Sequence, residues 1–539
     1  MNKKGFTLVE LLGVLIIMAI IMVVVVTPII GQIRNTAKKL DSASLQVLYK
    51  STTSYLDANK NLYPKSDGMV YYISVGQLID SGKLTNNYLS SYSEKVLSRS
   101  NAIKVTVENG GYQYAFAEAT ENLSTLYKAY QDVENDSTYT FMGGTYFSGA
   151  AANNYVYYSG FMWRIMGLNK DGSIKLVADE SVTTLNYGSD PSYKKSYIKE
   201  WLNDYFLSRL NYSDFLVKQK LCYLAAANTT ANQDVCANLV DTDASIDYAK
   251  VGQLSSYEYN MSILNGGTYL DNDSISSTLT YSTADTSKLY TILADGSITT
   301  KSINSMHYIR PVISLMPESI ITVGNGSNSN PYILFKQDKS IQQTDNRTLS
   351  SLNLSDGEYI IMNSRTYRVV DNDKSGVKAI LNDIYNVSDV DYTSSFGANS
   401  TFNTSAGLAQ TLNNDLYGYE YQALNGAVKV NFWYQGESTS LSSYYKSTSL
   451  SKTGIIYGVY VGLPKIGELL TVPIYGEITN NFWTISKSSN SAVNTISSSG
   501  VYETSVYSSA YVRPVIILSS DIIVESGNGT NNSPYRIIN

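Results

Sequence analysis

The apolar segment near the N-terminus constrains this chain more than any other feature of its sequence. Leu11 to Val26 form a run of about 16 residues in which Gly13 is the least apolar member. Phe6 to Val9 in front and Ile29-Ile30 behind extend it to the roughly 20 residues that a helix needs to cross a bilayer. The sequence therefore predicts a single membrane-spanning helix at the start of the chain.

The residues ahead of this run indicate where the chain is processed. Lys3 and Lys4 precede the apolar segment, and Gly5 separates them from it. A cleavable secretory signal has a shorter apolar core that is followed by a small-residue site. Here the small residue comes first, so cleavage after Gly5 leaves the hydrophobic helix on the mature protein.

Glu10 is the one acidic residue within this apolar region. A carboxylate in a membrane helix costs about 2–3 kcal/mol at full depth and less near the headgroups. One interpretation places Glu10 at the interface without a specific role. The other gives it a partner: cleavage after Gly5 creates an amine on Phe6, and that amine of one subunit can pair with Glu10 of a neighbour in a stack of identical chains.

The start Gly5-Phe-Thr-Leu-Val-Glu-Leu-Leu12, with two lysines before it and a long helix containing Pro28 after it, resembles type IV prepilins and pseudopilins. The resemblance implies cleavage between Gly5 and Phe6 by a prepilin peptidase and N-methylation of Phe6. It also implies that Glu10 sets the register between pilin subunits. The N-terminus would lie in the cytoplasm and the bulk outside the cytoplasmic membrane, an orientation that the near-balanced flanking charges do not decide.

The helical pattern continues past the apolar run. Apolar residues recur at helical spacing from Ile29 to Leu48, and Pro28 is expected to kink the helix. We therefore expect a leader over residues 1–5 and one transmembrane and pilin helix over 6–56; two separate helices are the alternative. A short helix ending at Gly82 and a hairpin turning at Asn109-Gly110 predict a small pilin-like head over 57–120. Residues 121–136 are predicted to form a linker or connecting helix.

The rest of the chain contains an internal duplication. Tyr308–Leu315 recurs as Tyr511–Leu518, and Gly324–Tyr332 recurs as Gly527–Tyr535, with the same offset of 203 residues. Weaker matches connect the same two regions without the constant offset: Trp163-Arg-Ile165 with Tyr367-Arg-Val369, Glu200–Asn203 with Gln410–Asn413, and Val251–Leu254 with Val461–Pro464. A period near 200 residues is too long for a solenoid repeat, so we expect two tandem β-rich domains, over 137–340 and 345–539. The predicted fold class is α+β.

Composition limits the classes of partner and of chemistry. Net charge is −6, and only 16% of residues are charged, so a mainly electrostatic nucleic-acid surface is not expected. The two cysteines, Cys222 and Cys236, are a candidate disulfide in an exported protein, with two free thiols as the alternative. With these cysteines and the single histidine, His307, the sequence predicts no metal site, no cofactor and no catalytic residues.

Four other motifs have plain structural interpretations. Gly324-Asn-Gly326 and its copy at 527–529 are expected to be turns, because no phosphate-loop residues follow them. Asp371–Asn382 resembles the start of a calcium loop but lacks the acidic twelfth residue. Arg310 and Arg513, which precede prolines, and Arg164 and Arg368, which also recur, are expected to form structural ion pairs with acids, and ligand binding is the alternative.

Together these features predict a structural or adhesive subunit of a type IV pilus or pseudopilus and not an enzyme. The size of the chain favours a minor or tip subunit, displayed outside the cell after assembly. The 47 tyrosines, with many Ser and Asn residues, suggest surface glycans as ligands of the distal domains. The alternatives are a competence or secretion pseudopilin and a membrane-anchored surface protein that is never assembled.

Overall fold

The computed structural model divides the chain into an N-terminal unit, Met1–Leu123, and a C-terminal unit, Ser124–Asn539. It describes residues 42–58, 70–85, 102–117, 124–223, 236, 246–271, 275–334, 348–352, 354–373, 376–421, 428, 431–434, 455–469, 480–497 and 500–537. Within these ranges, no helix combines the length and the apolar character that a membrane crossing requires. The predicted leader, the transmembrane segment and the first part of the predicted pilin helix lie outside the described residues.

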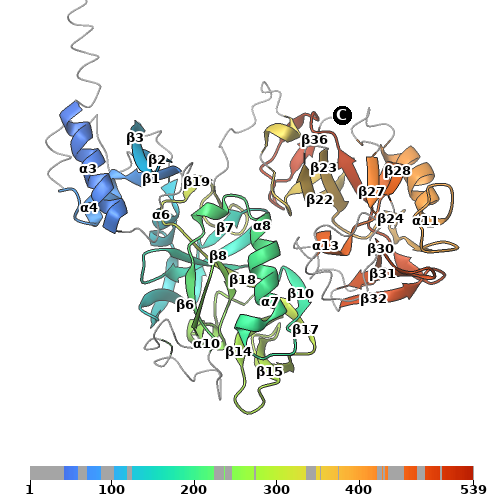
Figure 1. The fold of residues 1–539 in the computed structure, drawn as a ribbon, viewed down its shortest axis with the longest axis horizontal. Helices are drawn as coiled ribbons and strands as arrows, with labels where there is room; N and C mark the ends of the chain where they lie inside the picture. The colour runs from blue at the N-terminus through green and yellow to red at the C-terminus, as the bar shows by residue number, and fades with distance from the viewer. Residues whose placement is uncertain are drawn as a thin grey trace, which may run out of the picture. The chain divides into compact units, whose positions relative to one another are not determined.

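The N-terminal unit packs a helix on a small antiparallel sheet. Its described elements are α3 (Ser42–Ala58), β1 (Val70–Ser74), α4 (Val75–Asp80), β2 (Ala102–Glu108) and β3 (Gly111–Ala117), and the strand order is β1-β2-β3 (Figure 1). Leu48 and Leu56 of α3 are fully buried, as are alternate residues of β2, because alternate side chains of a strand share one face. Tyr49 stacks on Tyr114 of β3, with 5.2 Å between the ring centroids.

Two local predictions for this unit are confirmed. Strands β2 and β3 form the expected hairpin, and its turn residues Asn109 and Gly110 have φ angles of 52° and 70°. Such positive φ values are those of the tight turn that Asn-Gly favours. Helix α4 ends just before Gly82, whose φ is 68°, as expected for a glycine after a helix.

The C-terminal unit contains two large sheets, in residues 124–334 (the first half) and 348–537 (the second half). In the first, the order is β13-β18-β9-β8-β7-β20-β19-β4, and β6 joins β5 to β8. The strands are β4 (Ser124–Thr125), β5 (Glu134–Phe141), β6 (Gly144–Ala152), β7 (Tyr155–Tyr158), β8 (Phe161–Leu168), β9 (Ile174–Ala178), β13 (Val251–Gln253), β18 (Pro311–Leu315), β19 (Ile320–Val323) and β20 (Tyr332–Leu334).

The sheet of the second half has the order β29-β34-β23-β22-β21-β36-β35. Its strands are β21 (Tyr359–Met362), β22 (Arg365–Asp373), β23 (Gly376–Leu381), β29 (Val461–Gly462), β34 (Val515–Leu518), β35 (Val524–Ser526) and β36 (Tyr535–Ile537). Each of these strands has a counterpart at the same place in the first sheet. In both halves, the last strand after the Gly-Asn-Gly turn pairs in parallel with the first strand of the opening hairpin: β20 with β7, and β36 with β21.

Smaller strands and short helices complete each half. In the first half they are β10 (Thr183–Asn186), β11 (Gln219–Cys222), β12 (Ile246–Ala249), β14 (Ser276–Tyr281), β15 (Lys288–Ile292), β16 (Ile298–Ser302), β17 (Met306–Ile309), α6 (Leu126–Gln131), η2 (Tyr193–Lys195), α7 (Tyr197–Glu200), η3 (Trp201–Phe206), α8 (Leu207–Arg209), η4 (Ser213–Phe215) and α10 (Ser256–Ser262). Helix α6 falls within the predicted linker 121–136, and its Leu126 is fully buried in the core of the C-terminal unit.

The second half has a corresponding set of peripheral elements. They are β24 (Asn386–Val387), β25 (Val390–Asp391), β26 (Thr393–Ser395), β27 (Asn431–Tyr434), β28 (Ile455–Val459), β30 (Phe482–Ser489), β31 (Ala492–Ser497), β32 (Gly500–Ser505), β33 (Ser509–Tyr511), η5 (Leu349–Ser351), α11 (Gly407–Gln410), η6 (Thr411–Tyr421) and α13 (Ile466–Leu469). The described chain is therefore mixed α+β and mostly β, in agreement with the predicted fold class.

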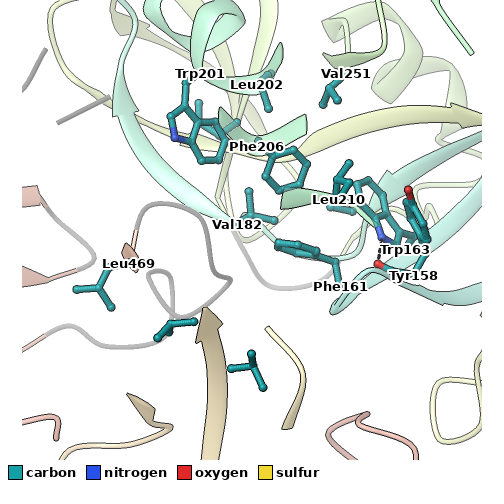
Figure 2. Close-up of a cluster of buried hydrophobic side chains, with 14 of the residues drawn as sticks. Tyr158, Phe161, Trp163, Val182, Trp201, Leu202, Phe206, Leu210, Val251 and Leu469 are labelled. Atoms are coloured by element: carbon teal, nitrogen blue, oxygen red, sulfur yellow. Dashed lines mark hydrogen bonds between the residues drawn. The ribbon is translucent and has the colours of Figure 1, made fainter. Parts of the chain in front are cut away.

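The elements α7, η3 and α8 follow one another as a helical segment of the first half, and its apolar face forms the centre of the core. Phe206 of this helix contacts the hairpin residues Phe161 and Trp163, with ring centroids 5.1 and 6.5 Å apart, and Trp201 packs on Phe206 at 5.4 Å. Figure 2 shows these rings together with Leu202, Leu210 and Val251. Packed aromatic pairs of this kind stabilise a core beyond the area that they bury.

An asparagine in each half connects the helix to the edge strand of the sheet. Asn203 donates from Nδ2 to the carbonyls of Lys199 and Val251, at 3.1 and 3.0 Å, and accepts from the Val251 amide. Asn413 makes the same bonds to Ala409 and Val461. Both asparagines lie in π-helical turns. In each half, the asparagine belongs to one of the weak sequence matches and the strand residue that it binds belongs to another. One side chain therefore connects the two matched segments.

Replacing Asn203 by alanine should destabilise the first half by roughly 1–3 kcal/mol, because the Val251 backbone groups lose their partner in a partly buried site. Urea denaturation of the full-length protein in detergent, followed by tryptophan fluorescence, measures this loss. Asn304→Ala is the matched control, since Asn304 is exposed. Equal stability of the two variants would contradict the bridging role of Asn203.

Candidate functional site

The predicted processing and assembly residues, Gly5, Phe6 and Glu10, lie outside the described residues. The described part of the chain instead contains the other residues that the sequence singles out: the cysteines, the recurring arginines and His307. It also contains two buried ion pairs that the sequence does not suggest.

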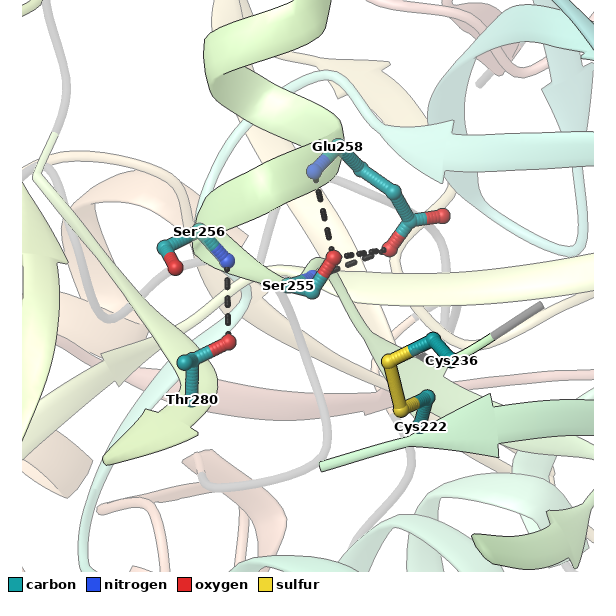
Figure 3. Close-up of a disulfide and its surroundings, with 6 residues drawn as sticks. All are labelled: Cys222, Cys236, Ser255, Ser256, Glu258 and Thr280. Atoms are coloured by element: carbon teal, nitrogen blue, oxygen red, sulfur yellow. Dashed lines mark hydrogen bonds between the residues drawn. A yellow bond between two sulfur atoms is a disulfide. The ribbon is translucent and has the colours of Figure 1, made fainter. Parts of the chain in front are cut away.

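Cys222 and Cys236 are joined by a disulfide in the structure, with 5.9 Å between their Cα atoms. Both residues are buried, and Cys222 is the last residue of β11 (Figure 3). The bond attaches Cys236 to the strand pair β11–β12. A cross-link of this length stabilises a domain chiefly by restricting its unfolded chain.

A buried ion pair attaches α10 to the sheet of the first half. Lys175 of β9 donates to Glu258, and the two side chains are only 6% and 4% exposed. The other carboxylate oxygen of Glu258 accepts from the Ser255 amide at 3.0 Å, while the Glu258 amide donates to Ser255 Oγ (Figure 3). This reciprocal arrangement is a capping box. Glu258 therefore caps the N-terminus of α10, and its carboxylate also neutralises the ammonium group of Lys175 in the sheet.

The second half contains the same ion pair and one of the two cap hydrogen bonds. Lys378 of β23 pairs with Glu468 of α13, with both side chains mostly buried, and Glu468 accepts from the Lys465 amide at 2.9 Å. Burial raises the pKa of the Glu468 carboxyl, but the charges of Lys378 and Lys465 outweigh it, so the pKa lies below its ordinary value. Lys175 and Lys378 differ by the offset of 203 found in the sequence, so the pair is a shared feature of the two halves.

The sequence predicts ion pairs for the recurring arginines, and within the residues that it describes the structure shows one for Arg164 but not for Arg310. Arg164 lies 3.5 Å from Asp179 and also binds Asn154 and the hydroxyl of Tyr155, as an ion-paired structural arginine would. Arg310 is different, because its side chain donates to the carbonyls of Ala178 and Leu270 at 2.7 and 2.8 Å. The ion pair expected for Arg310 is therefore wrong.

The second half repeats the backbone contact of Arg310. Arg513 Nε donates to the carbonyl of Leu381, the residue that corresponds to Ala178 at the end of the same strand. Arg368 donates to the carbonyl of Gly357 and lies over the ring of Tyr359 at 4.4 Å, as Arg164 lies over Tyr155 at 3.8 Å. These arginines hold the ends of sheet strands, where carbonyls leave the ladder and need donors.

His307 of β17 is fully buried between polar partners. Its Nε2 lies 2.8 Å from the Ser302 carbonyl, so Nε2 carries the proton, and Nδ1 accepts from Ser277 Oγ at 2.8 Å. Burial lowers the pKa of His307 to about 4, so the ring is neutral at pH 7. Both nitrogens are occupied in a structural role.

The remaining motifs are turns. Gly324 and Gly527 have φ angles of 107° and 98° in the predicted turns between the last two strands of each half. The segment that resembles a calcium loop lies in strands β22 and β23, which pair as a hairpin. In the described ranges, no group of three or more His, Cys, Asp or Glu side chains is arranged to hold a metal ion.

The buried pair of the first half predicts an asymmetric response to mutation. Lys175→Met should cost about 3–5 kcal/mol, because it leaves the Glu258 carboxylate buried without a cation. The double variant Lys175→Met/Glu258→Met should be more stable than that single variant, since it removes both charges. Urea denaturation measures all three proteins. Lys128→Met is the control, because the Lys128–Asp132 pair is 56% and 45% exposed and should contribute less than about 1 kcal/mol.

His307 predicts loss of stability in acid. The pKa of His307 is about 4 in the folded state and near 6.5 in the unfolded chain, so in between the unfolded chain binds a proton that the folded state does not. The contribution of neutral His307 to the free energy of unfolding is therefore complete above pH 6.5 and is lost as the pH decreases toward 4. The wild-type protein should lose roughly 2 kcal/mol more than His307→Gln between pH 7 and pH 5. Urea denaturation at both pH values tests this, and parallel losses in the two proteins would contradict it.

Comparison with known proteins places the N-terminus in a recognised class. Residues 1–26 match the family model described as the prokaryotic N-terminal methylation motif. Neither curated proteins nor solved structures gave a match to the chain. The matched segment contains Gly5, Phe6 and Glu10. It indicates a type IV pilin-like or pseudopilin protein, and such a motif implies a membrane-anchored chain that a prepilin peptidase processes and that assembles with other pilins.

Proposed function

We propose that this protein is a structural and adhesive minor subunit of a type IV pilus or pseudopilus. The observation that carries the proposal is the N-terminal methylation motif at residues 1–26. In this proposal, cleavage follows Gly5, Phe6 is methylated, and the helix that begins at Phe6 forms part of the filament core. Glu10 pairs with the new amine of a neighbouring subunit, which offsets the cost of a carboxylate in an apolar environment.

The architecture of the N-terminal unit supports this role. Helix α3 buries one face, including Leu48, Thr52 and Leu56, against a three-stranded sheet. A helix with one buried face suits the position between a membrane segment and a small globular head. The Tyr49–Tyr114 stack and the contact between Thr53 Oγ and the Tyr114 hydroxyl, at 2.6 Å, fasten the helix to β3.

The C-terminal unit supports a minor or tip position and an adhesive role. It comprises residues 124–539, most of the chain, and a subunit with so large an addition is poorly suited to dense helical packing along a shaft. Four tyrosines, at positions 212, 248, 502 and 507, expose 41–72% of their surface. Tyrosine offers a rigid ring and a hydroxyl, and Ser and Asn add adaptable hydrogen bonds, which is a composition that suits recognition of other surfaces. The proposed role is non-enzymatic.

Changing Glu10 to alanine should separate processing from assembly. The variant should still be cleaved, giving a chain that starts at methylated Phe6, but it should be lost from filaments, because the amine of the neighbour has no carboxylate to pair with. Mass spectrometry of the N-terminal peptide and immunoblotting of sheared filaments measure the two outcomes. Glu108→Ala, which removes an exposed glutamate of the β2–β3 turn, is the control and should assemble normally.

Two results would overturn the proposal. Glu10→Ala chains that enter filaments as efficiently as Glu108→Ala chains would remove the role of Glu10 in assembly. A native chain that retains Met1 and stays monomeric in detergent would fit a surface protein that is anchored but never assembled. Immunogold labelling tests the position: it should mark filament tips or scattered points, and uniform labelling of the shaft would indicate a major subunit.

A further inference from the structure

The two halves of the C-terminal unit are joined by specific polar contacts. Arg209 of the first half lies 3.1 Å from Asp356 of the second, and Asn211 Nδ2 donates to Ser355 Oγ at 2.7 Å. The buried hydroxyl of Tyr157 donates to the carbonyl of Gly529 at 2.9 Å. These contacts fix strand β7 and the end of α8 in the first half against the segment that precedes β21 and against the last turn of the second half.

A polar cavity of about 530 Å³ lies beside this junction. Its wall includes the tips of the two equivalent Gly-Asn-Gly turns: Asn328 comes from the first half and Asn531 and Asn532 from the second, with Asn532 Nδ2 donating to the Asn328 carbonyl at 3.2 Å. The copies of one sequence motif therefore meet at one site. Since both halves contribute walls, neither half alone can form the cavity.

The rest of the wall combines aromatic, apolar and charged groups. Tyr359 contributes a ring, and Phe161 and Val182 provide apolar surface that continues into the core of the first half (Figure 2). Asp179 and Glu180 contribute carboxylates, which accept hydrogen bonds. The volume falls within the range of small-molecule sites, which typically combine apolar walls with a few placed polar groups.

We propose that this cavity binds a neutral mono- or disaccharide. Saccharides present several hydroxyls beside patches of C–H surface, which matches amide and carboxylate groups placed next to aromatic and apolar walls. The lining charges are Asp179, Glu180 and Arg368, a formal sum of −1, which disfavours an anionic sugar. This inference rests on the adhesive role proposed above and assigns that role to one site in place of the general tyrosine-rich surface.

Titration calorimetry on the mature full-length protein in detergent tests the site. The neutral probes are glucose, galactose, N-acetylglucosamine, lactose and chitobiose. N-acetylneuraminic acid serves as the anionic sugar for comparison. At least one neutral sugar should bind with a Kd on the order of 1 mM or tighter. Asn531→Ala and Glu180→Gln should each weaken that binding about tenfold. Circular dichroism checks that both variants fold.

Matched controls locate the binding. Asn304→Ala removes an exposed asparagine outside the cavity, and Tyr507→Ala removes a tyrosine that is 72% exposed and is also outside it. Both should bind like the wild type. Loss of binding in Tyr507→Ala with full binding in Asn531→Ala would overturn the proposal, as would a preference for the anionic sugar or no binding of any neutral probe.

The test is independent of assembly. Glu10→Ala protein should keep its sugar affinity even though it is lost from filaments. If the wild type assembles and binds no neutral sugar, the cavity assignment fails and the subunit role stands. If sugar binds normally while Glu10→Ala enters filaments, the proposed assembly mechanism fails and the site stands.

Discussion

A lysine of the sheet paired with a buried glutamate is the interaction on which each half of the C-terminal unit depends. Lys175 and Lys378 lie on the strands next to β18 and β34, in the middle of their sheets, where an unpaired ammonium would be costly. Glu258 and Glu468 each supply the missing charge. Each also accepts a backbone amide three residues earlier, so the start of a short helix is fixed directly over the sheet. One carboxylate thus neutralises the sheet and positions the helix.

The two asparagines extend this framework to the edge of each sheet. Asn203 and Asn413 bind both backbone groups of one residue on the edge strand, β13 or β29, and they do so from π-helical turns. A helix in each half is thereby attached at the edge of the sheet and a second helix at its middle. The two sheets therefore share these polar contacts as well as their strand order.

Local patterns in the sequence predict the local structure well. The hairpin around Asn109-Gly110 and the short helix before Gly82 each rest on periodicity and turn chemistry within a few residues. The contact between Lys175 and Glu258 spans 83 residues, and no spacing rule indicates it. The prediction of an ion pair for Arg310 is wrong for a related reason. Arg310 donates to backbone carbonyls, and the sequence does not show which carbonyls lack a partner strand. The Gly-Asn-Gly copies are visible as turns, but their meeting at one cavity depends on how the halves pack.

The glycine at the junction of the halves makes their closest backbone contact specific to the first half. A Cβ atom on Gly160 would lie 1.8 Å from the Asp356 carbonyl oxygen, so the approach requires glycine at that position, where φ is 81°. In the second half, the corresponding β21–β22 turn is Asn363-Ser364. Ser364 carries a side chain at the position that corresponds to Gly160, so this close backbone approach belongs to the first half alone.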